Sequence, residues 1–177
     1  SKITEFALIA EFNFRPYMSR EPESEYNSTP FVFTGITKFY FNPQAQHNND
    51  TWHYLRPLTT EGQNSDAYPY RELYELNGLS VPFGIGYKFN VYNFITININ
   101  LSWRITFTDY LDDVSTTYVD ESTLSELGAE LADQSENNFP SGFQRGNPHD
   151  NDKYGFLGIT ILYSIKDPNK GCDNIIY

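Results

Sequence analysis

Cysteine, basic residues and long apolar runs are all scarce in this chain of 177 residues. The single cysteine, Cys172, excludes an intramolecular disulfide and a cysteine-based metal cluster. Only 12 lysines and arginines accompany 23 acidic residues, for a formal charge of -11, which argues against binding to nucleic-acid phosphates. No apolar run approaches the roughly 18 residues of a membrane-spanning helix, so a helical membrane protein is excluded.

Aromatic residues, in contrast, are abundant. The chain has 14 phenylalanines and 14 tyrosines, whereas disordered chains are depleted in aromatic residues. We therefore expect a folded chain, although its mean hydropathy is low at -0.54. Its start at Ser1 carries neither an initiator methionine nor a signal-peptide pattern, which predicts either processing or a start within a longer protein.

Five segments alternate between apolar and polar residues with a period of two, the pattern of β-strands. They cover residues 5–14, 31–41, 79–90, 94–107 and 153–166. The clearest runs from Ile95 to Phe107, with apolar residues at the odd positions and Thr, Asn, Ser and Arg at the even ones. Its length exceeds that of a typical globular strand and suits a tilted membrane strand of about 9–11 residues. Residues 91–93 predict a hairpin turn between two of these segments.

The fold class that this pattern predicts is all-β, an antiparallel transmembrane β-barrel of a Gram-negative outer membrane. Apolar faces nearly free of charge and aromatic residues at the strand ends are typical of such barrels. The lipid-facing residues are expected to be the odd positions from Ile95 to Phe107 and their counterparts, among them the phenylalanines of 31–41. Long linkers at about 42–78 and 109–152 are expected to be extracellular loops.

Strand parity then predicts that the barrel is incomplete in this chain. Bacterial barrels have an even number of strands and at least eight, so five strands correspond to the last five, with three expected before Ser1. Residues 1–166 would form the partial barrel, and residues 167–177 a periplasmic C-terminal tail. In that oxidising compartment, Cys172 is a candidate for an intermolecular disulfide.

Charged residues on the inward faces predict a plugged interior. An eight-stranded barrel is just wide enough for side chains to fill it, and a charge buried there needs a partner. We expect a network of ion pairs and hydrogen bonds in the lumen, formed by Glu5, Glu11, Lys38, Lys88 and Arg104.

The linker 109–152 is strongly acidic, with eleven acidic residues against Arg145 alone. Thr123 and Glu126 have the spacing of a capping box, which predicts a short helix from Thr123 to about Asp133. The aspartates lack the ligand spacing of an EF-hand loop. We expect a solvated acidic loop with no metal and no cofactor.

Two alternatives come from other functional classes. One is an outer-membrane enzyme that hydrolyses lipid or peptide, with His47, His53 or His149 in its outer loops and Ser65 and Asp66 near the first two in sequence. No nucleophile elbow or metal-ligand motif supports it, so we expect no catalytic activity. The other is a soluble ligand-binding β-sandwich, which also has alternating strands.

Six strings of the sequence, taken in this order, resemble the PorG-like outer-membrane β-barrels of Bacteroidota. The most specific part is the run Thr108, Asp109, Tyr110, Leu111, Asp112 and Asp113. The strings occupy residues 39–45, 57–63, 80–88, 106–118, 145–147 and 151–156, and the resemblance extends over about residues 31–163.

This resemblance implies a noncatalytic role in the type IX protein secretion system, which also supports gliding motility in some species. It implies an anchor or scaffold for a periplasmic ring of a PorK-like lipoprotein and a PorN-like protein. It also implies a signal peptide and further N-terminal strands, in agreement with the parity argument. No catalytic residues can be transferred from this family.

Overall fold

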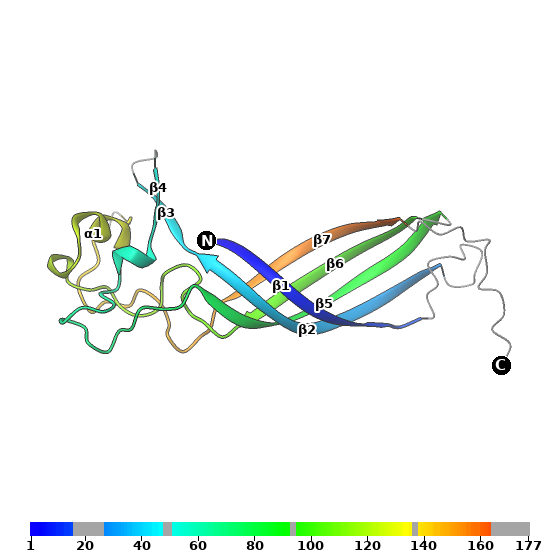
Figure 1. The fold of residues 1–177 in the computed structure, drawn as a ribbon, viewed down its shortest axis with the longest axis horizontal. Coiled ribbons are helices and arrows are strands. Elements are labelled where there is room, and N and C mark those ends of the chain that lie inside the picture. Colours follow the sequence, from blue (N-terminus) through cyan, green and yellow to red (C-terminus); the bar gives the residue numbers. More distant parts are fainter. Residues whose placement is uncertain (16–26, 48–50, 93–94, 136–137, 164–177) are drawn as a thin grey trace. The chain divides into compact units, whose positions relative to one another are not determined.

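The structure is a computed structural model that describes residues 1–15, 27–47, 51–92, 95–135 and 138–163. Its main element is a five-stranded sheet in the order β1-β2-β5-β6-β7 (Figure 1). These strands are β1 (Lys2–Asn13), β2 (Ser28–Asn42), β5 (Asn77–Tyr92), β6 (Ile95–Thr106) and β7 (Lys153–Tyr163). The all-β, mostly antiparallel class predicted from the alternation is thereby confirmed, and each expected segment overlaps one of these strands.

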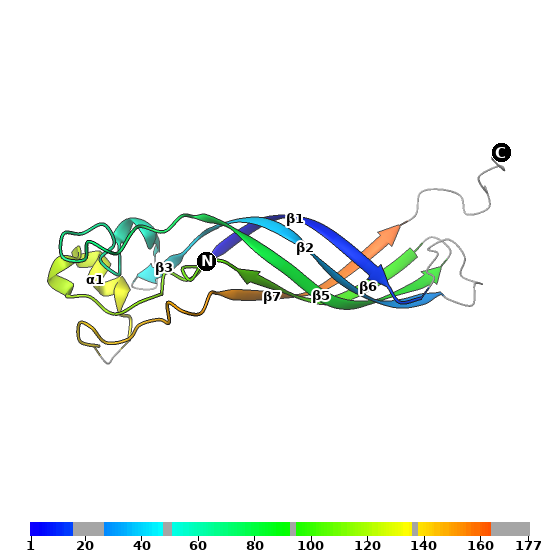
Figure 2. The same ribbon diagram turned by 90° about the horizontal axis from the view of Figure 1, so that it is seen from below.

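The sheet is open in the described residues, since its order begins at β1 and ends at β7 (Figure 2). An edge strand presents unpaired backbone N–H and C=O groups along its free side. Both β1 and β7 therefore have one edge without a neighbour in this part of the chain. Within the described residues, no helix has the length and apolar character needed to cross a membrane.

Shorter elements occupy the linkers. The strands β3 (Gln44–His47) and β4 (Thr51–Tyr54) pair as an antiparallel two-stranded sheet, followed by a 3-10 turn at Arg56–Leu58. A second 3-10 turn, Glu121–Thr123, precedes the helix α1 (Glu126–Ala132).

The helix begins two residues later than the capping box predicts. Ser125, not Thr123, is its N-cap, and the Ser125 hydroxyl accepts a hydrogen bond from the Gly128 amide at 3.1 Å. Thr123 instead ends the preceding 3-10 turn, which Asp120 caps by accepting from the Ser122 amide at 2.9 Å. Asp120 thus caps a 3-10 turn that includes Thr123, and the helix begins only after this turn, with Ser125 as its N-cap.

The chain divides into two compact units, which we describe separately. The strand unit comprises the described residues of Ala7–Ile36, Val81–Arg104 and Tyr154–Tyr177. The loop unit comprises those of Ser1–Phe6, Thr37–Ser80 and Ile105–Lys153, with all the short elements.

In the strand unit, the central strands β2, β5 and β6 have one face that is more buried than the other, whereas both faces of the edge strands β1 and β7 are mostly exposed. On β6 the expected alternation holds, because Ser102 and Arg104 are buried while Leu101 and Trp103 are exposed. The exposed face carries large apolar side chains from all five strands, including Leu8, Val32, Ile36, Ile85, Leu101, Leu157, Ile159 and Ile161.

On β2 the expected orientation is wrong. Phe31, expected on the lipid face, is only 2% exposed, while Val32 and Ile36 occupy the exposed face. The reason lies on β5, where Gly84 and Gly86 leave space above the backbone. A Cβ atom at Gly84 would lie 2.5 Å from Phe33 Cζ, and one at Gly86 would collide with the Phe31 ring. The phenylalanine rings therefore fill the space that the glycines leave on the buried face.

The loop unit has its own core. Phe39 and Phe41 of β2 are buried there, and the Phe41 ring stacks on Tyr74, which in turn stacks on Tyr110 with centroids 4.6 Å apart. Further apolar side chains buried in this unit come from the linkers, namely Leu55, Leu111, Val119 and Leu131. The linker 109–152 is therefore a packed structure with a core and not the solvated loop that its composition suggests.

Candidate functional site

The most elaborate arrangement of polar side chains is a buried network in the loop unit, centred on Glu61. The Glu61 side chain is fully buried and pairs with Arg145, whose Nη1 lies 3.1 Å from Glu61 Oε1. The carboxylate also accepts from the amides of Ser115 and Thr116 and from the Thr116 hydroxyl at 2.8 Å. The ion pair and these hydrogen bonds replace the interactions with water that the carboxylate loses on burial.

Asp113 is the second buried carboxylate of this network. It accepts hydrogen bonds from the Thr60 hydroxyl and from the Tyr74 hydroxyl, the latter at 2.5 Å. Its backbone has a φ of 71°, a left-handed conformation that aspartate tolerates better than most residues. The Asp113 carbonyl accepts from Arg145 Nη1 at 2.8 Å, so one guanidinium group binds both acidic segments.

A second guanidinium joins the same segments. Arg71 donates to the Glu61 carbonyl at 2.8 Å and to both the carbonyl and the hydroxyl of Thr117 at 3.0 and 2.7 Å. Arg145 Nε in turn donates to the carbonyl of Ala132, the last residue of α1, at 3.2 Å. The two arginines therefore connect the linker 42–78 with the linker 109–152, and the network acts as a structural brace.

Burial perturbs several acids around this brace. It raises the pKa of Asp113 above the ordinary aspartate value, against the opposing effect of the hydrogen bonds from Thr60 and Tyr74. It likewise raises the pKa of Asp109 and of Asp152, and the negative charge of Asp112 adds to both effects. Burial also raises the pKa of the Tyr74 phenol, which stays protonated and donates to Asp113.

The run from Thr108 to Asp113, the most specific string of the sequence, lies across this region. The Thr108 carbonyl accepts from the Asp152 amide at 2.9 Å, and Asp152 Oδ2 accepts from the Leu111 amide at 2.8 Å. Leu111 is buried in the core, and Asp112 caps the Val114 amide at 3.1 Å. Asp109 Oδ2 is buried without a hydrogen-bond partner in the described part of the chain.

Two of the three histidines lie close together, and each of the three takes part in local contacts. His47 Nε2 lies 2.5 Å from Glu130 Oε2 of α1, and the rings of His47 and His53 are 6.0 Å apart. His149 lies in an exposed turn, where its amide donates to Asn147 Oδ1 at 3.3 Å. Ser65 donates its hydroxyl to the Gly62 carbonyl and not to a histidine. Among the described residues, no cluster of three or more His, Cys, Asp or Glu is arranged to hold a metal ion.

Of the expected lumen charges, two meet directly. Lys88 Nζ forms an ion pair with Glu11 in the strand unit and lies 4.7 Å from the Phe31 ring centroid. Arg104 is buried in the same unit, with its guanidinium 5.1 Å from the Phe156 ring centroid. Glu5 is half-buried on β1, in the loop unit.

Lys38 does not join these charges. As an even-numbered residue of β2 it points away from the phenylalanine face, because successive side chains of a strand alternate. It donates to Asn77 Oδ1 and lies 5.8 Å from the Tyr40 ring centroid. The prediction of a lumen position for Lys38 rested on the same reversed assignment of faces as the prediction for Phe31.

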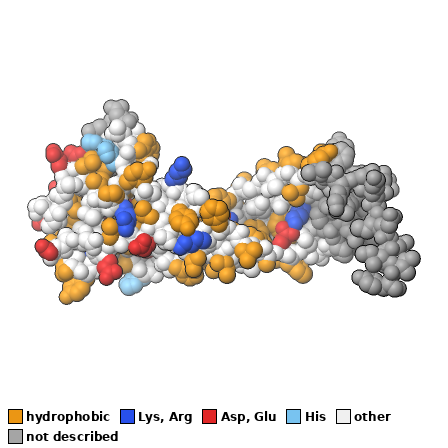
Figure 3. Space-filling model, in the orientation of Figure 1, with side chains coloured by type: hydrophobic (Ala, Val, Ile, Leu, Met, Phe, Trp, Pro, Cys, Tyr) orange, Lys and Arg blue, Asp and Glu red, His pale blue; other side chains and the backbone are white. Residues whose placement is uncertain are grey.

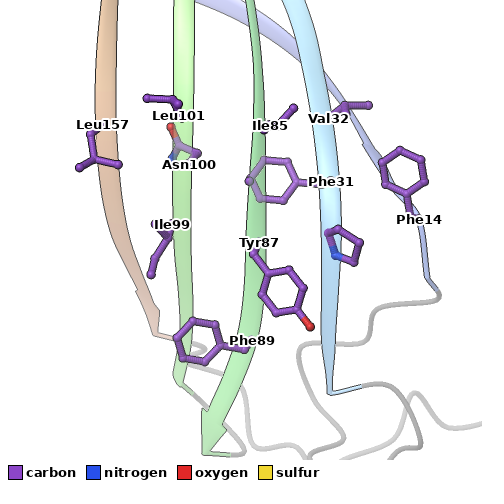
Figure 4. Close-up of a pocket in the computed structure, with 12 residues that line it drawn as sticks. Phe14, Phe31, Val32, Ile85, Tyr87, Phe89, Ile99, Asn100, Leu101 and Leu157 are labelled. Atoms are coloured by element: carbon purple, nitrogen blue, oxygen red, sulfur yellow. The ribbon is translucent and has the colours of Figure 1, made fainter.

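An apolar groove of about 550 Å³ lies on the strand unit (Figure 4). It spans the strands from Phe14 and Val32 through Ile85 and Leu101 to Leu157. Most of its lining is aliphatic or aromatic, with Asn100 the one amide among the lining residues. In Figure 3, most of the acidic side chains on the visible face lie over the loop unit.

Sequence reasoning missed Glu61, Arg145 and Arg71 as a group. The strings at residues 57–63 and 145–147 contain Glu61 and Arg145. These two residues are 84 positions apart in the sequence, and no periodicity connects them. The available signal was an isolated arginine in an acidic linker. Cys172 and residues 167–177 lie outside the described residues, as does Asn93 of the expected turn at 91–93, whereas the other two residues of that turn belong to β5, which ends at Tyr92.

In comparisons with protein-family models, curated proteins and solved structures, nothing matches this chain. The resemblance to PorG-like barrels therefore stays a prediction from the sequence.

Proposed function

We propose that this chain forms most of an eight-stranded outer-membrane β-barrel that acts as a noncatalytic scaffold in type IX protein secretion. The observation that carries the membrane assignment is the exposed face of the strand unit. Leu8 is 79% exposed, Leu157 74% and Ile161 70%, each on a regular strand. A continuous apolar surface on this scale is unfavourable in water and is what a lipid-facing wall requires.

The buried face supports a scaffold in preference to a conduit. Phenylalanine rings lie over the glycines of β5, and the Glu11 and Lys88 charges neutralise each other. Side chains fill the interior of small barrels in this way, whereas a channel needs an open polar lumen.

The open edges of the sheet support further strands in the complete assembly. Unpaired backbone groups are not tolerated in contact with lipid hydrocarbon, because each costs roughly 2–7 kcal/mol. Three additional strands between β1 and β7 give the even number that bacterial barrels have.

The proposed partners are the periplasmic PorK-like lipoprotein and PorN-like protein, beside outer-membrane lipid. Only two positions separate the end of β5 from the start of β6, and short connections are typical of the periplasmic side of such barrels. The long linkers of the loop unit would then be extracellular, and the tail with Cys172 periplasmic.

Site-specific photo-cross-linking in cells tests the role and the orientation together. A photo-reactive amino acid at Val91, an exposed residue beside the short turn, is expected to capture the ring lipoprotein. The matched control is the same amino acid at Tyr70, which is 97% exposed in the loop unit and should capture no ring component. Capture from position 70, or from neither position, contradicts the scaffold proposal.

Two measurements separate the proposal from its rivals. Complete solubility of the purified chain without detergent contradicts membrane insertion and favours the β-sandwich. Hydrolysis of lipid or peptide that the His149→Ala substitution abolishes favours the enzyme. On nonreducing gels, a shift to monomer mobility only in Cys172→Ser supports the intermolecular disulfide.

A further inference from the structure

The loop unit is acidic overall, but it also carries a patch of basic and aromatic side chains. We propose that this patch, formed by Lys2, Lys38, Tyr40, Trp52 and Tyr54, binds the phosphorylated sugar headgroup of a glycolipid in the outer leaflet. The inference rests on the proposed membrane function and names a ligand for one surface of the barrel.

The β3–β4 hairpin presents two different faces. Directly opposed residues in an antiparallel pair share a face, and the register pairs Gln44 with Tyr54 and Gln46 with Trp52. The other face carries His47, which contacts Glu130 of α1. One face is therefore held against the helix, while Trp52 is 64% and Tyr54 51% exposed on the other.

The long strands add the positive charge. Along the sequence of β2 the even-numbered residues change from Val32 and Ile36 to Lys38 and Tyr40, and on β1 the even-numbered residues begin with Lys2. Lysines and aromatic residues at the end of an apolar run in a membrane strand are typical of the level of the lipid headgroups.

Two adjoining hollows are lined by Lys2 and the three aromatic residues of the patch, and Lys38 Nζ lies 5.8 Å from the ring centroid of one of them, Tyr40. One, of about 180 Å³, lies among Lys2, Thr4, Tyr40, Gln44 and Tyr54, and the other, of about 290 Å³, is lined by Lys2, Gln44 and Trp52. Both are smaller than the roughly 300–1,000 Å³ of a typical small-molecule pocket, which suits a sugar ring or a phosphate group.

The chemistry of the lining favours an anionic sugar over other ligands. No acidic residue lines either hollow in the described part of the chain. The ammonium group of Lys38 has three N–H donors, of which Asn77 takes one, so it can also bind a phosphate oxygen. Exposed Trp and Tyr rings offer flat apolar surfaces against which a sugar ring can stack.

The test uses the two tryptophans as separate reporters. In the full chain carrying Trp103→Phe, Trp52 is the remaining tryptophan and reports on the patch. Adding a phosphorylated lipid A to this protein in phosphatidylcholine vesicles should shift the Trp52 emission to shorter wavelength. Lys2→Gln and Lys38→Gln should each weaken this binding about fivefold, as expected for one basic residue at an anionic surface. The matched controls are Lys153→Gln for charge and Tyr70→Ala for aromatic exposure, and both should bind normally.

Further arms identify the ligand. Dephosphorylated lipid A should bind more weakly, and phosphatidylglycerol should not reproduce the emission shift. Equal binding of phosphatidylglycerol overturns the sugar assignment, and equal affinity of the Lys2, Lys38 and Lys153 variants overturns the patch. Capture of a protein partner by a photo-cross-linker at position 54, without any lipid A response, also overturns it.

A separate readout distinguishes failure of the patch from failure of the membrane proposal. In Trp52→Phe protein, Trp103 remains on the exposed face of β6, beside Phe83. Quenching of Trp103 by phospholipids with brominated acyl chains reports insertion of the strand unit. Quenched Trp103 with an unresponsive Trp52 rejects the headgroup site alone, whereas unquenched Trp103 rejects the membrane proposal itself.

Discussion

At the scale of single residues, Arg145 forms hydrogen bonds with several separate segments of the loop unit. Its side chain is 6% exposed, and the side chain of its partner Glu61 is fully buried. Breaking a buried ion pair leaves one charge uncompensated in a medium of low polarity, which is far more costly than losing an exposed pair.

We expect Arg145→Met to destabilise the loop unit by about 3–5 kcal/mol, the range for removal of one partner from a buried pair. The amides of Ser115 and Thr116 donate to Glu61, so their hydrogen-exchange rates report the opening of this site directly. Lys153→Met, at an exposed position, is the control. Combining Arg145→Met with Glu61→Gln should recover part of the loss, and unchanged exchange in Arg145→Met contradicts a bracing role.

Asp109 predicts a pH effect of defined sign. Its pKa is raised by burial, so the folded chain holds this proton more tightly than the unfolded chain, whose aspartates titrate near 3.9. The contribution of Asp109 to stability is therefore lost as the pH rises from the ordinary aspartate pKa through the raised one. We expect Asp109→Asn to raise the midpoint of thermal unfolding at pH 7 and to leave it unchanged near pH 3. An equal change in the midpoint at both pH values would show that Asp109→Asn acts through packing and not through loss of a titrating group.

At the scale of elements, strand positions were predictable and strand faces only partly so. Alternation locates a strand whichever way it faces, and on β6 the polar residues Ser102 and Arg104 also identify the buried side. On β2 both faces carry apolar residues, so the richer one was assigned to lipid. The missing information was in the neighbour, because Gly84 and Gly86 of β5 provide the space for the phenylalanine rings.

The glycines of β5 predict sensitivity to even one methyl group. A Cβ atom at Gly86 would meet both the Phe31 ring and, at 2.7 Å, the carbonyl oxygen of Ile99 on the neighbouring strand. We expect Gly86→Ala to lower stability by about 1–3 kcal/mol, as overpacking generally does. Gly155→Ala is the matched control, since its nearest contact would be the Ser102 carbonyl at 3.2 Å. Equal urea midpoints for the two variants contradict a close contact at Gly86.

The loop elements were the least predictable from sequence. The helix was expected from its capping residues, yet the choice between Thr123 and Ser125 depends on the Asp120 turn before it. The Glu61 network joins linkers that only the tertiary fold brings together, so no local pattern of composition or period could indicate it.

At the scale of the whole molecule, the proposal predicts a fixed orientation in the membrane. In a Cys172→Ser background, Tyr70→Cys places a new thiol at a position whose native side chain is 97% exposed in the loop unit. A membrane-impermeant maleimide added to intact cells should label this position, because the long linkers are proposed to be extracellular. The Cys172→Ser parent has no other cysteine and should remain unlabelled.

The native Cys172 should show the opposite behaviour. After reduction, it should react only when the outer membrane is permeabilised, because the tail is proposed to be periplasmic. Labelling of Cys172 in intact cells, or of position 70 only in permeabilised cells, would reverse the orientation and remove the periplasmic ring from the candidate partners of the tail.

The packing of phenylalanine rings over glycines also predicts which positions can change during evolution. At Gly78 the three atoms nearest to an added Cβ atom all belong to the Phe39 ring, the first at 2.8 Å, so a larger residue there can be accommodated by a smaller one at position 39. At Gly84 and Gly86 the carbonyls of Leu101 and Ile99 also intrude, and no side-chain change moves them. Among descendants of this sequence, positions 39 and 78 should vary as a pair, while positions 84 and 86 should remain glycine.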